Sequence, residues 1–152
     1  LKISWTVENV FEYVVEESSG LRHLRDRLLK SSASLTRQQR IDIGALAFDK
    51  LNEMRGGITE KALTLLEDSV EEVEINQITE EKVVMHGAFL VRKDRQNDFA
   101  AAAQKVADLL GEDYAVKVDG PWAPFSFVRR IELFEVLNGE DEANKGKGEK
   151  AA

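Results

Sequence analysis

Residues 113–128 read DYAVKVDGPWAPFSFV, and they combine a strand pattern with a sharp interruption. Apolar side chains alternate with polar or small ones as far as Val118, which is typical of a strand with one buried face. Residues 120–127, called the aromatic corner, then place three aromatic side chains around two prolines: Gly120, Pro121, Trp122, Ala123, Pro124, Phe125, Ser126 and Phe127. The stretch therefore predicts a strand that ends in a rigid corner, because proline fixes the backbone on either side of Trp122.

Three earlier segments are also predicted to be strands. Residues 2–7 and 73–75 show the same alternation, whereas residues 83–91, VVMHGAFLV, are almost continuously apolar. Apolar runs of this length are typical of strands that are buried on both faces, so we expect residues 83–91 at the centre of a sheet. We expect the last strand, which begins near Tyr114, to be an inner strand beside the first.

Between the strands, apolar residues recur at the spacing of a helix. The helical pattern occupies three segments: residues 8–30, 36–69 and 94–110. Thr36 and Gln39 have the spacing of a capping box, which predicts that a helix begins after Thr36. Asp94 is expected to cap the last of the three segments.

The long middle segment carries two glycine-containing features. Gly44 and Ala45 form a small patch where another helix could approach closely. Gly56-Gly57 predicts a kink or a break, because each glycine costs a helix about 1 kcal/mol relative to alanine. Thr59 could cap a continuation after such a break.

The order of these elements indicates an α+β fold. Strand, helices, strand, strand, helix and strand follow one another as in the ferredoxin-like βαββαβ fold, which has one antiparallel sheet. The first crossover is enlarged here into a helical hairpin over about residues 8–69. With helices on one face, the sheet is expected to bury Trp5, Phe89 and Val116.

One domain is expected over residues 1–138, with a last helix in residues 129–137. Residues 139–152 contain acidic residues, glycine and lysine without apolar periodicity, so they are predicted to be a disordered tail. The sequence begins at Leu1, without methionine, and enters a strand pattern at once. We therefore expect that further residues of the natural protein precede it.

Composition excludes several classes of function. The chain has 152 residues, a net charge of −7 and a pI near 5.0, so its field repels nucleic acid and anionic membrane surfaces. It has no cysteine, which excludes disulfides, thiol catalysis and thiolate metal sites, and which fits the cytoplasm. No apolar run is long enough to predict a membrane span.

No catalytic, cofactor-binding or metal-binding residues can be assigned. His23 lies among arginines on a helix face that we expect to be exposed, and His86 is expected on the open face of the sheet. Two isolated histidines do not make a metal site. The acidic pairs are interpreted as solvated surface, because adjacent carboxylates do not face each other: Glu71-Glu72, Glu80-Glu81 and Glu140-Asp141-Glu142.

The aromatic corner has two interpretations. In the favoured one it is a core plug, in which Trp122 and Phe125 cover the end of the sheet and Pro124 prevents continuation of the strand. In the other it is a recognition surface for an apolar partner, because tryptophan is enriched at binding hot spots and a rigid segment loses little entropy on binding. The orientation of Trp122 decides between them.

The string GPWAPFSFV resembles a signature near the C-terminus of the gas vesicle protein F/L (GvpF/GvpL) family. Three other strings resemble the family in the same order: KISWTVENV, TRQQRIDIGALAFDKL with Arg40, Ile41, Asp42 and Gly44, and VVMHGAFLVRKDRQNDFAAAAQKVADLL. The resemblance covers about residues 1–128. The sequence departs from the family pattern at Ala123, where a second proline is usual, at Phe125, where tyrosine is usual, and at His86, where asparagine is common.

The resemblance implies a non-enzymatic accessory or minor structural protein of gas vesicles, located in the cytoplasm and on the vesicle. It also implies that the protein binds the hydrophobic shell protein and other accessory proteins during assembly, and that another α/β domain normally comes before this region. The partner-binding residues expected from the corner are Gly120, Pro121, Trp122, Pro124, Phe125 and Phe127.

Two other classes of function remain open from the residues alone. A small-molecule-sensing module of the ferredoxin-like type would need a polar pocket near His86 and Asp119. An enzyme would need His86 together with a nearby carboxylate.

Overall fold

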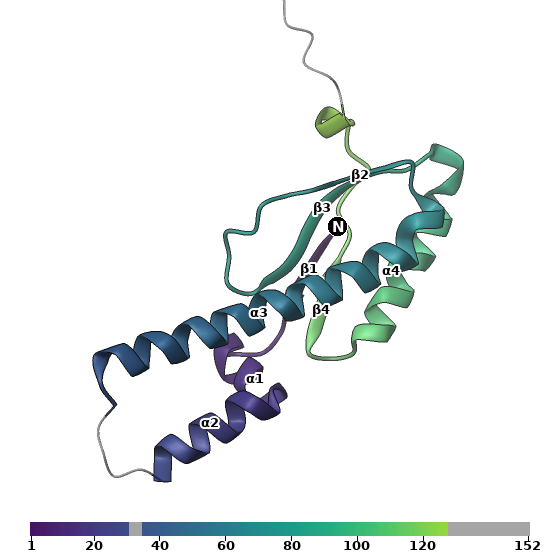
Figure 1. The fold of residues 1–152 in the computed structure, drawn as a ribbon. Helices are drawn as coiled ribbons and strands as arrows, with labels where there is room; N and C mark the ends of the chain where they lie inside the picture. Colours follow the sequence, from purple (N-terminus) through teal and green to yellow (C-terminus); the bar gives the residue numbers. More distant parts are fainter. Residues whose placement is uncertain (31–34, 128–152) are drawn as a thin grey trace, which may run out of the picture.

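A four-stranded antiparallel sheet forms one layer of the protein (Figure 1). The computed structural model describes residues 1–30 and 35–127. The strands are β1 (Lys2–Trp5), β2 (Glu72–Ile75), β3 (Val83–Leu90) and β4 (Tyr114–Lys117), in the spatial order β2-β3-β1-β4. Every neighbouring pair is antiparallel. The α+β class and the antiparallel sheet are thus confirmed.

Helices form the second layer. Within the described residues they are α1 (Val10–Glu17), α2 (Ser19–Lys30), α3 (Arg37–Leu66) and α4 (Gln96–Leu110). Short 3₁₀ helices also occur in the connections, η1 (Glu67–Ser69) and η2 (Lys93–Arg95), and after β4, η3 (Phe125–Phe127). Figure 1 shows α3 and α4 lying across the same face of the sheet, with α1 and α2 at one side. The N-terminal half of α3 extends past the edge of the strands.

The predicted inner position of the last strand is wrong. β4 pairs with β1 alone and lies at one edge of the sheet, while β2 lies at the other. Its sequence agrees with this position in hindsight, because Ala115 and Lys117 are exposed and only Tyr114 and Val116 are half-buried. The corresponding side chains of the inner strand β1, Ile3 and Trp5, are buried. The predicted helix in residues 129–137 and the predicted tail lie outside the described residues.

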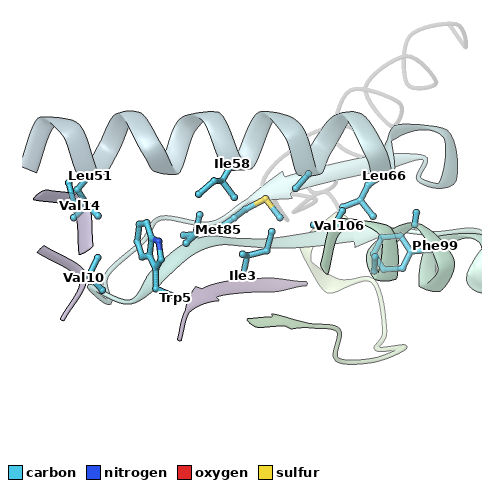
Figure 2. Close-up of a cluster of buried hydrophobic side chains, with 14 residues drawn as sticks. Ile3, Trp5, Val10, Val14, Leu51, Ile58, Leu66, Met85, Phe99 and Val106 are labelled. Carbon is cyan, nitrogen blue, oxygen red and sulfur yellow. The ribbon is translucent and has the colours of Figure 1, made fainter. Parts of the chain in front are cut away.

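The core lies between the sheet and α3, and the strand alternation explains its composition. Ile3 and Trp5 point from β1 toward the helices (Figure 2). The largest fully buried side chains come from both layers: Ile3, Val10, Val14, Leu51, Leu66, Val84, Met85 and Val106. Of the side chains expected under the helices, Trp5 is 3% exposed, while Phe89 and Val116 are half-buried against the core.

The two predicted helix starts have different outcomes. The capping box is confirmed, since the Gln39 N–H donates to Thr36 Oγ1 at 3.2 Å and the Thr36 N–H donates to Gln39 Oε1 at 3.0 Å. Asp94 does not cap α4, because η2 precedes that helix. Its carboxylate instead pairs with Arg92 at 2.8 Å, and this hydrogen bond lowers the pKa of Asp94.

The predicted break at Gly56-Gly57 is also wrong, because α3 runs through both glycines. The helix buries residues on each side of them, Leu51 before and Ile58, Ala62 and Leu66 after. Helix propensity is a weak preference, and burial of a continuous apolar face outweighs a cost of about 2 kcal/mol for the two glycines.

We expect Gly57→Ala to raise the free energy of unfolding by about 1 kcal/mol, which is about 3 °C in Tm. A Cβ at this position would meet no atom within 4 Å, so alanine fits without strain. Thermal unfolding followed by circular dichroism measures the shift. Gly120→Ala is the control and should destabilise, because Gly120 has a φ of +129° and a Cβ there would lie 3.2 Å from Trp122 Cδ1. A destabilising Gly57→Ala would contradict an unstrained helix at this position.

Candidate partner-binding surface

The aromatic corner leaves the sheet where β4 ends. Gly120 turns the chain with a φ of +129°, and the side chains of Pro121, Trp122 and Pro124 are exposed. Phe125 begins η3, in which Phe127 is half-buried. The predicted residues follow one another in one segment after β4, and the Phe125 side chain lies outside what the structure describes.

The favoured interpretation of the corner as a core plug is wrong for Trp122, whose side chain is 80% exposed. Because β4 ends at Lys117, the corner lies beyond the last residue of β4 that pairs with β1. Val118, just before it, is 47% exposed. Two large apolar side chains therefore meet solvent within a short segment.

The corner also reaches the opposite edge of the sheet. β4 lies at one edge, yet η3 at the end of the corner lies against β2 at the other. Figure 1 shows this path, in which the chain after β4 passes the N-terminus and reaches the short helix η3 above β2. The Phe127 N–H donates to the Pro124 carbonyl at 3.1 Å and closes this last turn.

A second surface feature is an open groove of about 820 Å³ between α3 and the segment that includes β2. Leu63 and Gly56 lie on its α3 side, and Val70, Val73 and Ile78 line the opposite side. Most of this lining is apolar, but three carboxylates also border the groove: Glu60, Glu67 and Glu71.

At one end of the groove, Arg55 of α3 forms hydrogen bonds with the segment that leads into β3. Its Nε donates to the Val83 carbonyl at 3.0 Å, and one terminal nitrogen donates to the Glu81 carbonyl at 2.7 Å. The guanidinium also lies 5.5 Å from the centre of the Trp5 ring. Burial lowers the pKa of Arg55, with the Glu81 carboxylate acting in the opposite direction. Arg55 is thus a structural cation that joins α3 to the start of β3.

The remaining candidate residues are dispersed. His23 is exposed on α2, and His86 is exposed on β3 opposite Lys2, on the sheet face away from the core, as predicted. Glu80 is paired with Lys2 at 3.1 Å. Within residues 1–30 and 35–127, no group of histidine, aspartate and glutamate could hold a metal ion.

Neither alternative class of function gains support from these positions. His86 and Asp119 do not line the groove, and the Asp119 carboxylate is paired with Lys117 at 3.2 Å on the surface. The acidic pair at Glu71-Glu72 is separated by the strand geometry, with Glu71 at the groove and Glu72 exposed on β2. Among the described helices, none is long and apolar enough to cross a membrane.

The groove was missed in the sequence, although part of a signal was present. Its α3 side carries small or apolar residues at spacings of three or four, ending at Gly56, Thr59 and Leu63. That series is separate from the buried face through Leu51, Ile58 and Ala62, so α3 has two such faces. A search for a second periodic face on the same helix could have found it.

Comparison with known proteins identifies a family. A family model described as gas vesicle synthesis protein GvpL/GvpF matches residues 1–129. Gas vesicle protein F of Haloferax mediterranei is 32% identical over 84 residues, which make up 51% of this chain and 39% of that protein.

Solved structures agree on the fold. The crystal structure of gas vesicle protein GvpF from an Anabaena species superposes with a TM-score of 0.77 at 19% identity, over 86% of this chain and 53% of that chain. GvpF from Microcystis aeruginosa gives a TM-score of 0.65 at 18% identity, over 84% of this chain and 52% of that chain. The chain thus spans about half the length of these relatives.

Proposed function

The chain belongs to the family of gas vesicle synthesis proteins GvpL/GvpF, and on that basis we propose that it is an accessory or minor structural protein of gas vesicles. In this role it binds the hydrophobic shell subunit and other accessory proteins while the vesicle is assembled. It acts in the cytoplasm and at the gas vesicle. The role is one of binding, with no catalysed reaction.

The observation that carries the proposal is the exposure of Trp122. A tryptophan that is 80% exposed leaves a large apolar surface in water, and the residues beside it include two prolines and Val118. Burying such a surface against an apolar partner is favourable. Because the prolines already restrict the backbone, little conformational entropy is lost when the segment binds.

The acidic body supports the same role. A net charge of −7 keeps the chain soluble while it holds an apolar partner. The corner would cover part of the apolar surface through which shell subunits associate with one another, and would thereby delay premature aggregation. The proposed contact residues are those predicted from the sequence: Gly120, Pro121, Trp122, Pro124, Phe125 and Phe127.

We expect Trp122→Ala to weaken binding of the shell subunit about 30-fold, as for a hot spot worth about 2 kcal/mol. The free energy of unfolding should change by less than about 0.5 kcal/mol, because the side chain is exposed. Co-expression with the shell subunit, followed by measurement of the soluble fraction and a pull-down, tests both effects.

Leu109→Ala is the matched control, since Leu109 is 59% exposed on α4 and is not part of the corner. This variant should keep the shell subunit soluble as well as the unmodified chain does. If Trp122→Ala also does so, or if both variants lose binding equally, the corner is not the contact surface. Unfolding of Trp122→Ala would show that Trp122 has a structural role.

A further inference from the structure

A second exposed face runs along α3, separate from the aromatic corner. Its residues recur at spacings of three or four and are mostly small or apolar, a set we call the α3 stripe: Ile41, Ala45, Phe48, Asn52, Gly56, Thr59 and Leu63. Ile41 is 54% and Phe48 51% exposed, while Leu63 and Gly56 line the groove. The stripe therefore continues from the exposed side of the N-terminal half of α3 into the groove.

The α3 stripe is long enough for a second helix of similar length to lie along it. From residue 41 to residue 63 it extends about 33 Å at 1.5 Å per residue. Ala45 and Gly56 leave room for close approach, and a Cβ on Gly44 or Gly56 would meet no atom within 4 Å. Helices pack closely when small residues lie at the contact. The small patch noticed in the sequence at Gly44 and Ala45 thus has no helix against it within the described residues.

Acidic side chains follow one side of the stripe along its whole length. They form an acidic row along α3 that ends at its C-cap residue Glu67, and all are exposed: Asp42, Asp49, Glu53, Glu60 and Glu67. At about 100° per residue, this row lies roughly 80° around the helix from the stripe, on the side opposite the buried face. Glu53 is paired with Lys50 at 2.9 Å, and no ion pair between described residues involves the other four.

We propose that the α3 stripe is a docking site for an amphipathic helix of another protein, with an apolar face toward the stripe and lysine or arginine along the edge that meets the acidic row. Such a helix would bury the exposed side chains of Ile41 and Phe48. Its apolar face would also contact Val70, Val73 and Ile78 across the groove. Charge complementarity favours one orientation, because the acidic row supplies five carboxylates along one edge of the docked helix, whereas Glu71 is the one lining carboxylate on the other side of the groove.

The test uses synthetic peptides with the chain as it exists. The first is an amphipathic peptide of about 22 residues, which matches the stripe in length, with leucine and alanine on one face and lysine along one edge. The second has the same composition in scrambled order, and the third has glutamate in place of lysine. Fluorescence anisotropy should give at least tenfold tighter binding for the first than for either of the others.

Matched variants locate the site. The double variant Glu60→Gln, Glu67→Gln should weaken binding of the first peptide about tenfold, and so should Phe48→Ala alone. The control pair Glu17→Gln, Asp108→Asn removes the same charge from exposed positions on α1 and α4, and should leave binding within twofold. Equal loss in both pairs would mean that net charge alone attracts the peptide, and this would overturn the proposal.

The remaining outcomes also decide the question. Equal binding of ordered and scrambled peptides, or no binding of any peptide, overturns the site. If sedimentation shows a dimer of the chain that Phe48→Ala dissociates, the stripe is occupied by a second copy, and the proposed occupant is wrong. The shell subunit takes no part in these measurements, so their failure is distinguishable from failure of the proposed function.

Discussion

Replacing Leu51 by alanine is expected to lower the free energy of unfolding by about 3 kcal/mol, the largest effect of a single substitution that we predict. Leu51 is 1% exposed, at the place where α3 meets α1. Figure 2 shows it beside Val14 of α1. Truncation removes apolar contacts and leaves a cavity between two helices, which cannot close without moving α1.

Urea denaturation of the two forms measures this loss. Leu46→Ala is the matched control, because Leu46 lies on the same helix but is 52% exposed. It should change the free energy of unfolding by less than about 0.5 kcal/mol. If the two substitutions cost the same, the junction of α1 and α3 does not contribute the buried contacts described. A loss at Leu51 below about 1 kcal/mol would have the same meaning.

Sequence patterns that depend on neighbouring residues were sufficient to predict the two layers of the fold. The alternation around Ile3 and Trp5 placed both side chains under the helices, because successive strand residues point to opposite faces. The capping box at Thr36 and Gln39 predicted the start of α3 for a similar reason, since its partners are three residues apart. Interactions of short range leave a signature in the sequence.

The wrong predictions concern the balance between local preference and packing. Gly56-Gly57 favours a break, but burial of Leu51, Ile58 and other residues on both sides keeps α3 continuous. Tryptophan is a large apolar residue of the kind found in cores, but Trp122 is buried only if another element packs over it. No periodic pattern states where the chain goes after an edge strand ends, so the exposure of Trp122 could be found only in the structure.

The candidate sites divide in the same way. The aromatic corner is a contiguous segment, so its residues could be proposed together from the sequence. The groove joins α3 to residues of the segment 70–84, and Arg55 holds these parts together through backbone carbonyls. A carbonyl acceptor is present at every residue and leaves no sequence signal. Arg55 therefore could not be recognised before the structure showed where its guanidinium points.

Replacing Arg55 by alanine is expected to lower the free energy of unfolding by about 2 kcal/mol, because hydrogen bonds from a charged donor are each worth more than neutral ones. The substitution removes the donors to the Val83 and Glu81 carbonyls and the contact with the Trp5 ring. Chemical denaturation gives the energy. Amide hydrogen exchange should become faster in residues 80–83, since their attachment to α3 is lost.

Two further variants distinguish the hydrogen bonds of Arg55 from the effect of its positive charge. Arg40→Ala removes an exposed arginine from the same helix and should change stability by less than about 0.5 kcal/mol. Arg55→Lys keeps the charge but not the planar fork, so it should recover less than half of the loss. Because the acceptors are neutral carbonyls, the cost of Arg55→Ala should be nearly the same at low and high salt. If the loss of stability in Arg55→Ala disappears at high salt, or if Arg55→Lys is as stable as the unmodified chain, Arg55 acts through a surface ion pair. The hydrogen bonds from Arg55 would then not hold the two sides of the groove together.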